Sequence, residues 1–243
     1  MMGRAMPVLD VAALTDTGRK RKRNEDAVLA EWPCFLVADG VGGSEAGDLA
    51  SAAVVEAFRA LHPGDRPGTL LTVRAAFARA ERAVRAVADG TRDGAGSTLT
   101  GVILVEHEGE LSWLVINVGD SRVYQHLGSE LTQLTVDHSL LQEALDAIEE
   151  GTADGWDDLP MSNVITRALG ADDSRPDTWL LPVVTGVRLL ICSDGLHGEL
   201  DDEQLRALLT MGGKPGSLVP ELIRRANAAG GGDNISAIVV DVL

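Results

Sequence analysis

Apolar and polar residues alternate with a period of two over eight short segments, the pattern of β-strands that bury one face. The predicted strands cover residues 8–14, 27–31, 35–38, 98–106, 111–118, 122–127, 187–192 and 237–242. Apolar residues at helical spacing predict helices over residues 46–61, 70–88, 140–149, 201–211 and 218–229. The chain therefore combines many short strands with several helices, which excludes a helical bundle.

The order of these segments favours an α+β fold. Strands come in runs and helices in pairs, whereas a doubly wound parallel sheet needs strict alternation of strand and helix. Antiparallel sheets covered by helices on their outer faces fit this order better. A length of 243 residues suits one sizeable core, so we predict a single domain over residues 1–243.

Composition and charge narrow the class of protein. Hydrophobic residues make up 45% of the chain but aromatic ones only 3%, so the core must depend on aliphatic side chains. The formal net charge of −16 argues against a general affinity for nucleic acid. Cys34 and Cys192 lie inside apolar strand segments, as buried free thiols do, and we expect a cytoplasmic protein. No apolar stretch is long enough to span a bilayer.

Three carboxylates stand where apolar strands begin or end. Two predicted strands run directly into Asp-Gly, at Asp39 and at Asp194, and Asp233 comes just before the last strand. A buried strand that ends in a carboxylate, followed by glycine where backbone segments approach closely, is a common way to hold a hard divalent cation. The sequence therefore predicts a carboxylate metal site.

A run of five basic residues, 19–23, is followed at once by two carboxylates, Glu25 and Asp26. In an extended segment the side chains alternate, so one arginine of the run would point inward. An inward arginine beside metal-binding carboxylates suits a phosphate group, because guanidinium matches two phosphate oxygens. A solvated basic patch or a tether for nucleic acid remains an alternative for the run as a whole.

Eight short motifs follow one another along the chain. They are Arg21-x-x-Asn24-Glu25-Asp26, Val37-Ala38-Asp39-Gly40-Val41-Gly42-Gly43, Gly96-Ser97-Thr98, Asn117-Val118-Gly119-Asp120-Ser121-Arg122, Asp137-His138-Ser139, Asn163-Val164-Ile165-Thr166-Arg167-Ala168-Leu169-Gly170, Ser193-Asp194-Gly195 and Gly232-Asp233-Asn234. In this order they resemble the PPM family, the metal-dependent type 2C protein serine/threonine phosphatases, and more closely its compact bacterial members. The resemblance implies a four-layer αββα sandwich, two antiparallel β-sheets flanked by helices, with a flap at about residues 140–163 beside the active site.

The resemblance also implies a role for each motif residue. Two Mn²⁺ or Mg²⁺ ions, with a third in some bacterial members, would be held by carboxylates and one carbonyl, while an arginine binds the substrate phosphate. Asp39 would bridge two ions, with the Gly40 carbonyl joining one of them and Asp194 and Asp233 holding the other. Glu25 and Asp26 would complete the shell, largely through metal-bound water. Asp120 together with Asp194 would hold the third ion. Arg21 is the implied phosphate ligand, and Arg21 and Asp39 are the implied catalytic residues.

The implied function is hydrolysis of phosphoserine and phosphothreonine in proteins by a metal-activated water, which reverses serine/threonine kinase signalling. Expected partners are phosphorylated proteins, among them a serine/threonine kinase or its substrates, with no nucleic acid, and the protein is expected to be a monomer. One alternative is a catalytically silent sensor module of the same fold that binds phosphoproteins. The other is a nucleic-acid-associated protein tethered by residues 19–23, which conflicts with the overall charge.

The chain departs from the family pattern near the site. Val41 stands where animal relatives carry the histidine proposed as acid for the leaving alkoxide, so another proton donor is needed. Gly232, His197 and Gly198 also differ from the usual residues, which puts substrate preference in doubt. The flap is acidic and should favour phosphopeptides with basic residues nearby, through Glu143, Asp146, Glu149, Glu150, Asp154, Asp157 and Asp158.

Overall fold

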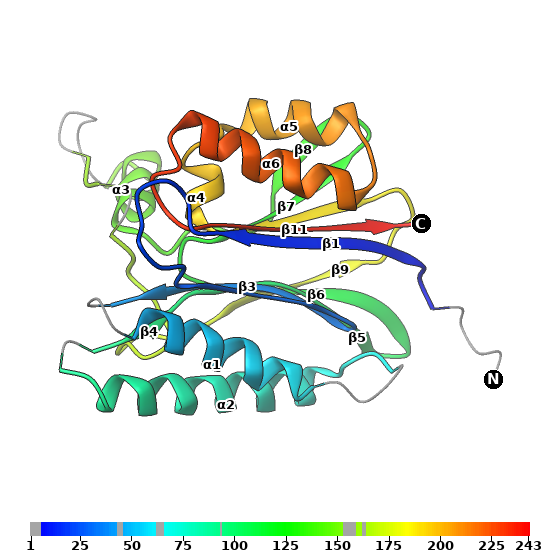
Figure 1. Ribbon diagram of the computed structural model, residues 1–243. Coiled ribbons are helices and arrows are strands. Elements are labelled where there is room, and N and C mark those ends of the chain that lie inside the picture. Colours follow the sequence, from blue (N-terminus) through cyan, green and yellow to red (C-terminus); the bar gives the residue numbers. More distant parts are fainter. Residues whose placement is uncertain (1–5, 43–45, 62–65, 93, 153–158, 162–163) are drawn as a thin grey trace.

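The computed structural model describes residues 6–42, 46–61, 66–92, 94–152, 159–161 and 164–243. Two antiparallel sheets lie face to face, with helices on the outer face of each (Figure 1). The order of strands in one sheet is β1-β11-β10-β7-β8, and in the other β2-β3-β5-β6-β9, with β4 paired to β3. The predicted αββα arrangement is confirmed.

The strands match the predicted ones to within a few residues, and three more are present. Their bounds are β1 Leu9–Asp16, β2 Asp26–Glu31, β3 Cys34–Val41, β4 Gly96–Ser97, β5 Leu99–His107, β6 Glu110–Val118, β7 Arg122–Leu127, β8 Glu130–Gln133, β9 Asp177–Pro182, β10 Arg188–Cys192 and β11 Ile235–Val242. Strands β4, β8 and β9 were not predicted from the sequence. The first two are very short, and β9 is an edge strand whose consecutive leucines, Leu180 and Leu181, obscure the alternation.

The helices begin and end close to the predicted positions. They are α1 Gly47–Arg59, α2 Leu70–Asp89, α3 Leu140–Glu149, α4 Asp194–His197, α5 Asp202–Met211 and α6 Pro215–Ala229. Thr69 and Asp201 each form a capping box at the start of a helix. Helix α6 has no such cap and begins with Pro215, whose fixed φ suits the first turn. The missed helix α4 is a single turn, too short to show a period. None of the helices among the described residues is long and apolar enough to cross a bilayer.

Three apolar clusters separate the four layers. Strand β3 shows why, because its side chains alternate: Phe35 and Val37 pack in the cluster between the two sheets, while Leu36 and Ala38 pack in the cluster beneath α1 and α2. A third cluster lies between the other sheet and helices α4 to α6. Strand β3 is thus buried on both faces and carries Asp39 near its end.

Candidate active site

One cavity of about 230 Å³ collects most of the residues that the sequence singles out. Its walls come from the end of β3, the start of α4, the loop before β11, the turn after β6 and the basic loop before β2. Seven of the eight predicted site residues line it, namely Arg21, Glu25, Asp39, Gly40, Asp120, Asp194 and Asp233. Their roles as ligands stay a prediction, but the fold brings them to one place.

The eighth residue, Asp26, is buried next to the cavity rather than in its wall. Antiparallel pairing of β2 with β3 sets Asp26 directly opposite Asp39. Its Oδ2 accepts a hydrogen bond of 2.8 Å from the Ser193 hydroxyl, and its Oδ1 has no hydrogen-bond donor among the described residues. The register of one strand pair thus explains why two carboxylates meet at this depth.

Both Asp-Gly sequences need glycine because other backbone lies against them. A Cβ on Gly40 would lie 2.1 Å from the carbonyl oxygen of Gly47, and a Cβ on Gly195 would lie 1.9 Å from that of Asn234. No side chain fits at such distances. The two glycines therefore let α1 and the loop before β11 close around Asp39 and Asp194, as the sequence predicted.

The buried carboxylates raise one another's pKa. Burial raises the pKa of Asp26 to about 7, and the charges of Asp194 and Asp233 add to the effect. Burial also raises the pKa of Asp120 to about 7, and repulsion from Asp194 and Asp137 adds to the effect. Burial raises the pKa of Asp39 well above its usual value, and repulsion from Asp26 and Asp194 contributes. The pKa of Asp194 is raised by burial and by Asp233. Charge of this density calls for a counter-ion.

Arg21 is the one member of the basic run 19–23 that lines the cavity. Its Nη2 donates to Asp233 Oδ2 at 2.6 Å, and this hydrogen bond raises the arginine pKa further. The sequence-based prediction that alternation along an extended segment points one arginine inward was wrong, because residues 18–20 form a turn. The turn is fixed where the backbone N–H groups of Arg19 and Lys20 donate to the carbonyl of Gly231, at 2.8 and 3.2 Å.

Asn234 locks the basic loop to the loop that carries Asp233, a role the sequence analysis missed. Its Nδ2 donates to the carbonyls of Thr17 and Arg23 at 2.9 and 2.8 Å, and its Oδ1 accepts from the backbone N–H of Glu25 at 2.8 Å. Its position directly after Asp233 was a signal that it belongs to the site. Its contacts with Thr17, Arg23 and Glu25 could not be predicted, because only the fold brings these residues close to Asn234.

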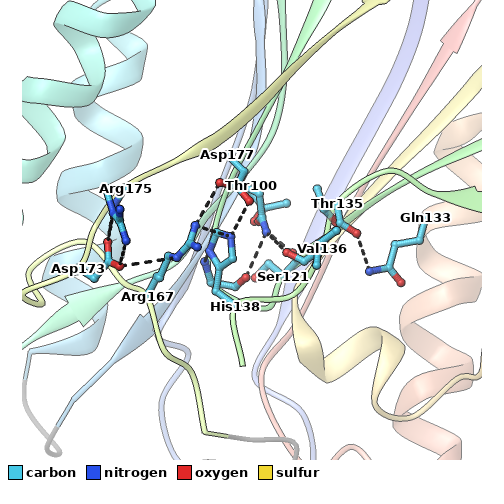
Figure 2. A network of polar contacts seen from close by, with 12 residues as sticks. Thr100, Ser121, Gln133, Thr135, Val136, His138, Arg167, Asp173, Arg175 and Asp177 are labelled. Atoms are coloured by element: carbon cyan, nitrogen blue, oxygen red, sulfur yellow. Dashed lines mark hydrogen bonds and ion pairs between the residues drawn. The ribbon is translucent and has the colours of Figure 1, made fainter. Parts of the chain in front are cut away.

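A polar network that includes His138, Arg167 and Asp177 (Figure 2) holds the turn that carries Gly119 and Asp120. The Gly119 N–H donates to His138 Nδ1 at 3.1 Å, so Nε2 carries the ring proton and donates to Asp177 at 3.2 Å. Arg167 donates to the other oxygen of Asp177 at 3.1 Å. Through this network the turn that carries Asp120 is connected to Asp177 on β9 and to Arg167, which follows the flap.

His197 fixes Asp120 from the other side. Its Nε2 donates to the Asp120 carbonyl at 3.0 Å, and burial lowers the pKa of the ring to about 4, so it is neutral at physiological pH. Val41 and Ile165 also line the cavity, and neither side chain can ionise.

The flap begins with α3 as predicted, and its described acids, Glu143, Asp146, Glu149 and Glu150, are exposed. Residues 153–158 and 162–163, with Asp154, Asp157 and Asp158, lie outside the described part.

The site has the chemistry that Mn²⁺ or Mg²⁺ requires. All the candidate ligands are oxygen atoms, and an oxygen of Asp194, like that of Asp26, is buried without a hydrogen-bond donor among the described residues. No group of three or more His, Cys, Asp or Glu within the described ranges is already gathered tightly enough to hold an ion. The carboxylates instead surround a cavity, and cations there would relieve their mutual repulsion.

Comparison with known proteins identifies the family. The family model described as protein phosphatase 2C matches residues 17–230. The serine/threonine protein phosphatase PstP of Mycobacterium tuberculosis is 34% identical over 247 residues, which cover all of this chain and 46% of that protein. The serine/threonine phosphatase stp of Listeria monocytogenes is 33% identical over 93% of each chain.

Solved structures share the fold over almost the whole chain. The crystal structure of the PstP catalytic domain in complex with two manganese ions gives a TM-score of 0.84 at 32% identity, over 98% of this chain and 100% of that one. The fold is thus shared with a serine/threonine phosphatase catalytic domain that binds two manganese ions. The chain belongs to the protein phosphatase 2C family. It spans about half the length of the mycobacterial relatives it matches.

Proposed function

We propose that this chain hydrolyses phosphoserine and phosphothreonine in proteins and depends on Mn²⁺ or Mg²⁺. The observation that carries the proposal is the single cavity lined by Asp39, Asp120, Asp194 and Asp233 together with the Arg21 guanidinium. Negative side chains suit cations, and the one arginine suits the anionic substrate. The names of the bacterial relatives, serine/threonine phosphatases, support the same substrate class.

Asp39, the Gly40 carbonyl, Asp194 and Asp233 would hold two cations, and Asp120 with Asp194 would hold a third. Glu25 and Asp26 would complete the shell, largely through water. When bound, the cations supply the Lewis acidity that activates an attacking water and offsets charge at phosphorus. The planar guanidinium of Arg21 binds two oxygens of the phosphate and keeps the ester in line for attack. Valine at position 41 cannot donate a proton, so the leaving alkoxide takes its proton from water in the cavity.

Charge and composition support proposals about the partners and the cellular compartment. Phosphoproteins are the proposed partners, among them a serine/threonine kinase or its substrates, and the exposed acids of α3 favour basic segments around the phosphorylated residue. Cys34 and Cys192 are free and buried, which suits a reducing compartment, and we place the protein in the cytoplasm. We further propose that residues 1–243 act as one catalytic domain, since strand ends of both sheets supply the candidate site, and that the protein is a monomer.

The test uses two substrates, an aryl phosphate and a phosphothreonine peptide. Mn²⁺ should support turnover of both, and excess chelator should abolish it. Asp39→Asn should lower turnover by at least about a hundredfold while the circular dichroism spectrum stays the same, because the ligand charge is lost but the strands keep their core. A protein that binds the phosphopeptide but turns over neither substrate would be a sensor module instead. Turnover that persists in chelator would exclude the metal mechanism.

A further inference from the structure

A second cavity of about 310 Å³ adjoins the candidate active site. The two share Asp120 and Asp194, which line both, so the second cavity begins where the first one ends. Its far wall is formed by α3, the first part of the flap, and we call it the α3 cavity. The proposed function gives α3 and the residues along it no catalytic role.

The fixed charges of the α3 cavity are already compensated. Arg122 and Asp137 form a bidentate ion pair, with Nε to Oδ1 at 2.9 Å and Nη2 to Oδ2 at 2.7 Å. Both side chains are largely buried, at 23% and 9% exposure, so neither is available to a charged ligand. The cations of the proposed function would offset Asp120 and Asp194. A charged ligand therefore gains little here.

Ser139, Gln142 and His197 also line the cavity, together with two half-buried leucines of α3, which give its wall an apolar surface. Leu141 and Leu145 lie one turn apart on α3 and both line the cavity. Helix α3 has a clear apolar side, yet none of its residues is buried. Its first turn is nevertheless well anchored, since the Ser139 hydroxyl accepts from the backbone of Gln142 and the Leu140 N–H donates to the carbonyl of Val164 at 2.9 Å.

We propose that the α3 cavity is a specificity subsite that binds an aliphatic side chain next to the phosphorylated residue of the substrate. The inference rests on the proposed function, since the occupant is a neighbour of a phosphate bound at Arg21. Three features of the cavity support the proposal: its continuity with the active site, its compensated charges, and the apolar surface that Leu141 and Leu145 give to its α3 side. The exposed acids of α3 lie outside the cavity and attract basic residues farther along the peptide.

The first experiment compares phosphothreonine peptides that carry Leu, Ala, Lys or Glu at each of the two positions on either side of the phosphothreonine. At one position the leucine peptide should exceed the alanine peptide about tenfold in kcat/KM, because three more carbon atoms leave water. The advantage should persist in high salt, which screens charge but not apolar contact. Equal values for leucine and alanine at all four positions would overturn the proposal. So would a preference for lysine at the selective position that disappears in salt.

The second experiment assigns the preference to the wall of the cavity. Leu145→Ala should reduce the leucine-to-alanine ratio to about threefold or less, because the contact area shrinks. Leu140→Ala is the matched control, the same substitution on the same helix at a residue that is 40% exposed and does not line the cavity. The readout is a ratio within one enzyme, so a general loss of activity cancels. An unchanged ratio in Leu145→Ala, or an equal drop in both variants, would exclude the subsite.

Wild-type turnover of an aryl phosphate separates the two proposals. If the aryl phosphate is hydrolysed and no peptide position shows a preference, the subsite fails while the phosphatase function stands. If neither the aryl phosphate nor any peptide is hydrolysed with Mn²⁺, the proposed function itself fails.

Discussion

Asp26 offers the most direct test of the free-energy cost of burying negative charge in the carboxylate cluster. Without metal, the folded protein must bury the Asp26 charge near Asp194 and Asp233, and burial raises its pKa from 3.8 to about 7. The unfolded chain has no such penalty. Replacing the carboxylate by an amide of the same shape, Asp26→Asn, should therefore stabilise the metal-free protein at neutral and alkaline pH. The Ser193 hydroxyl still finds an oxygen acceptor in the variant.

The sign and size follow from proton linkage. Between pH 4 and 7 the folded state binds the proton at Asp26 and the unfolded state has lost it, so stability falls as the pH rises through this window. The shift from 3.8 to about 7 is worth on the order of 4 kcal/mol once the pH exceeds both values. For a protein of this size that corresponds to roughly 10 °C in Tm. The gain in Asp26→Asn should be absent near pH 4 and complete above pH 7.

Thermal unfolding in chelator between pH 4 and pH 8 measures the effect. Asp172→Asn is the matched control, because Asp172 is exposed and forms no ion pair with any residue in the described ranges. The control should follow the wild type at every pH. Added Mn²⁺ should raise the Tm of the wild type more at pH 8 than at pH 6, since protons compete with the cation for the carboxylates. Equal Tm values for Asp26→Asn and wild type at pH 8 in chelator would refute the argument.

Three further outcomes are expected of the loaded enzyme. Asp194→Asn should lower kcat by at least about a hundredfold and weaken Mn²⁺ binding in calorimetry, because it removes a charge that lines both cavities; near-normal activity would exclude Asp194 as a ligand. Arg21→Ala should lower kcat/KM for a phosphopeptide roughly tenfold or more, whereas exposed Lys22→Ala should change it less than about twofold; equal losses would indicate a diffuse basic patch. Asp120→Ala should slow a phosphothreonine peptide more than an aryl phosphate, whose leaving group needs no proton; equal slowing on both would exclude a part in leaving-group protonation.

The sequence predicted the layered fold well because local patterns specify it. Strands with one face toward each neighbouring layer show period two, and helices α1 and α2 show Ala-rich apolar faces at helical spacing. The missed elements lack such a pattern. Strand β8 is four residues long and half-exposed, and α4 is one turn whose role is to present Asp194. Elements this short are fixed by their neighbours in space.

The candidate site was predicted from motifs, whereas the contacts that shape it were not. Arg21 was the right arginine for the wrong reason, since a turn and not strand alternation directs it inward. Glu199 is another example, because its Oε1 accepts from the Gly232 N–H at 2.7 Å and so braces the loop before Asp233. The two residues are 33 positions apart, and only the fold brings them together. Long-range contacts of single polar residues leave no periodic trace in a sequence.

The ion pair between Arg21 and Asp233 joins the proposed phosphate ligand to a proposed metal ligand. Asp233 Oδ2 accepts from Arg21 at 2.6 Å and its Oδ1 accepts from the Asn234 N–H at 2.8 Å, so a cation at Asp233 competes with the arginine. A phosphate that draws Arg21 away frees this carboxylate for metal, and metal at Asp233 frees Arg21 for phosphate. Linkage is reciprocal, so each ligand should tighten the other. In calorimetry, inorganic phosphate should strengthen Mn²⁺ binding to the wild type but not to Arg21→Ala, and equal strengthening in both would show that the ion pair does not couple them.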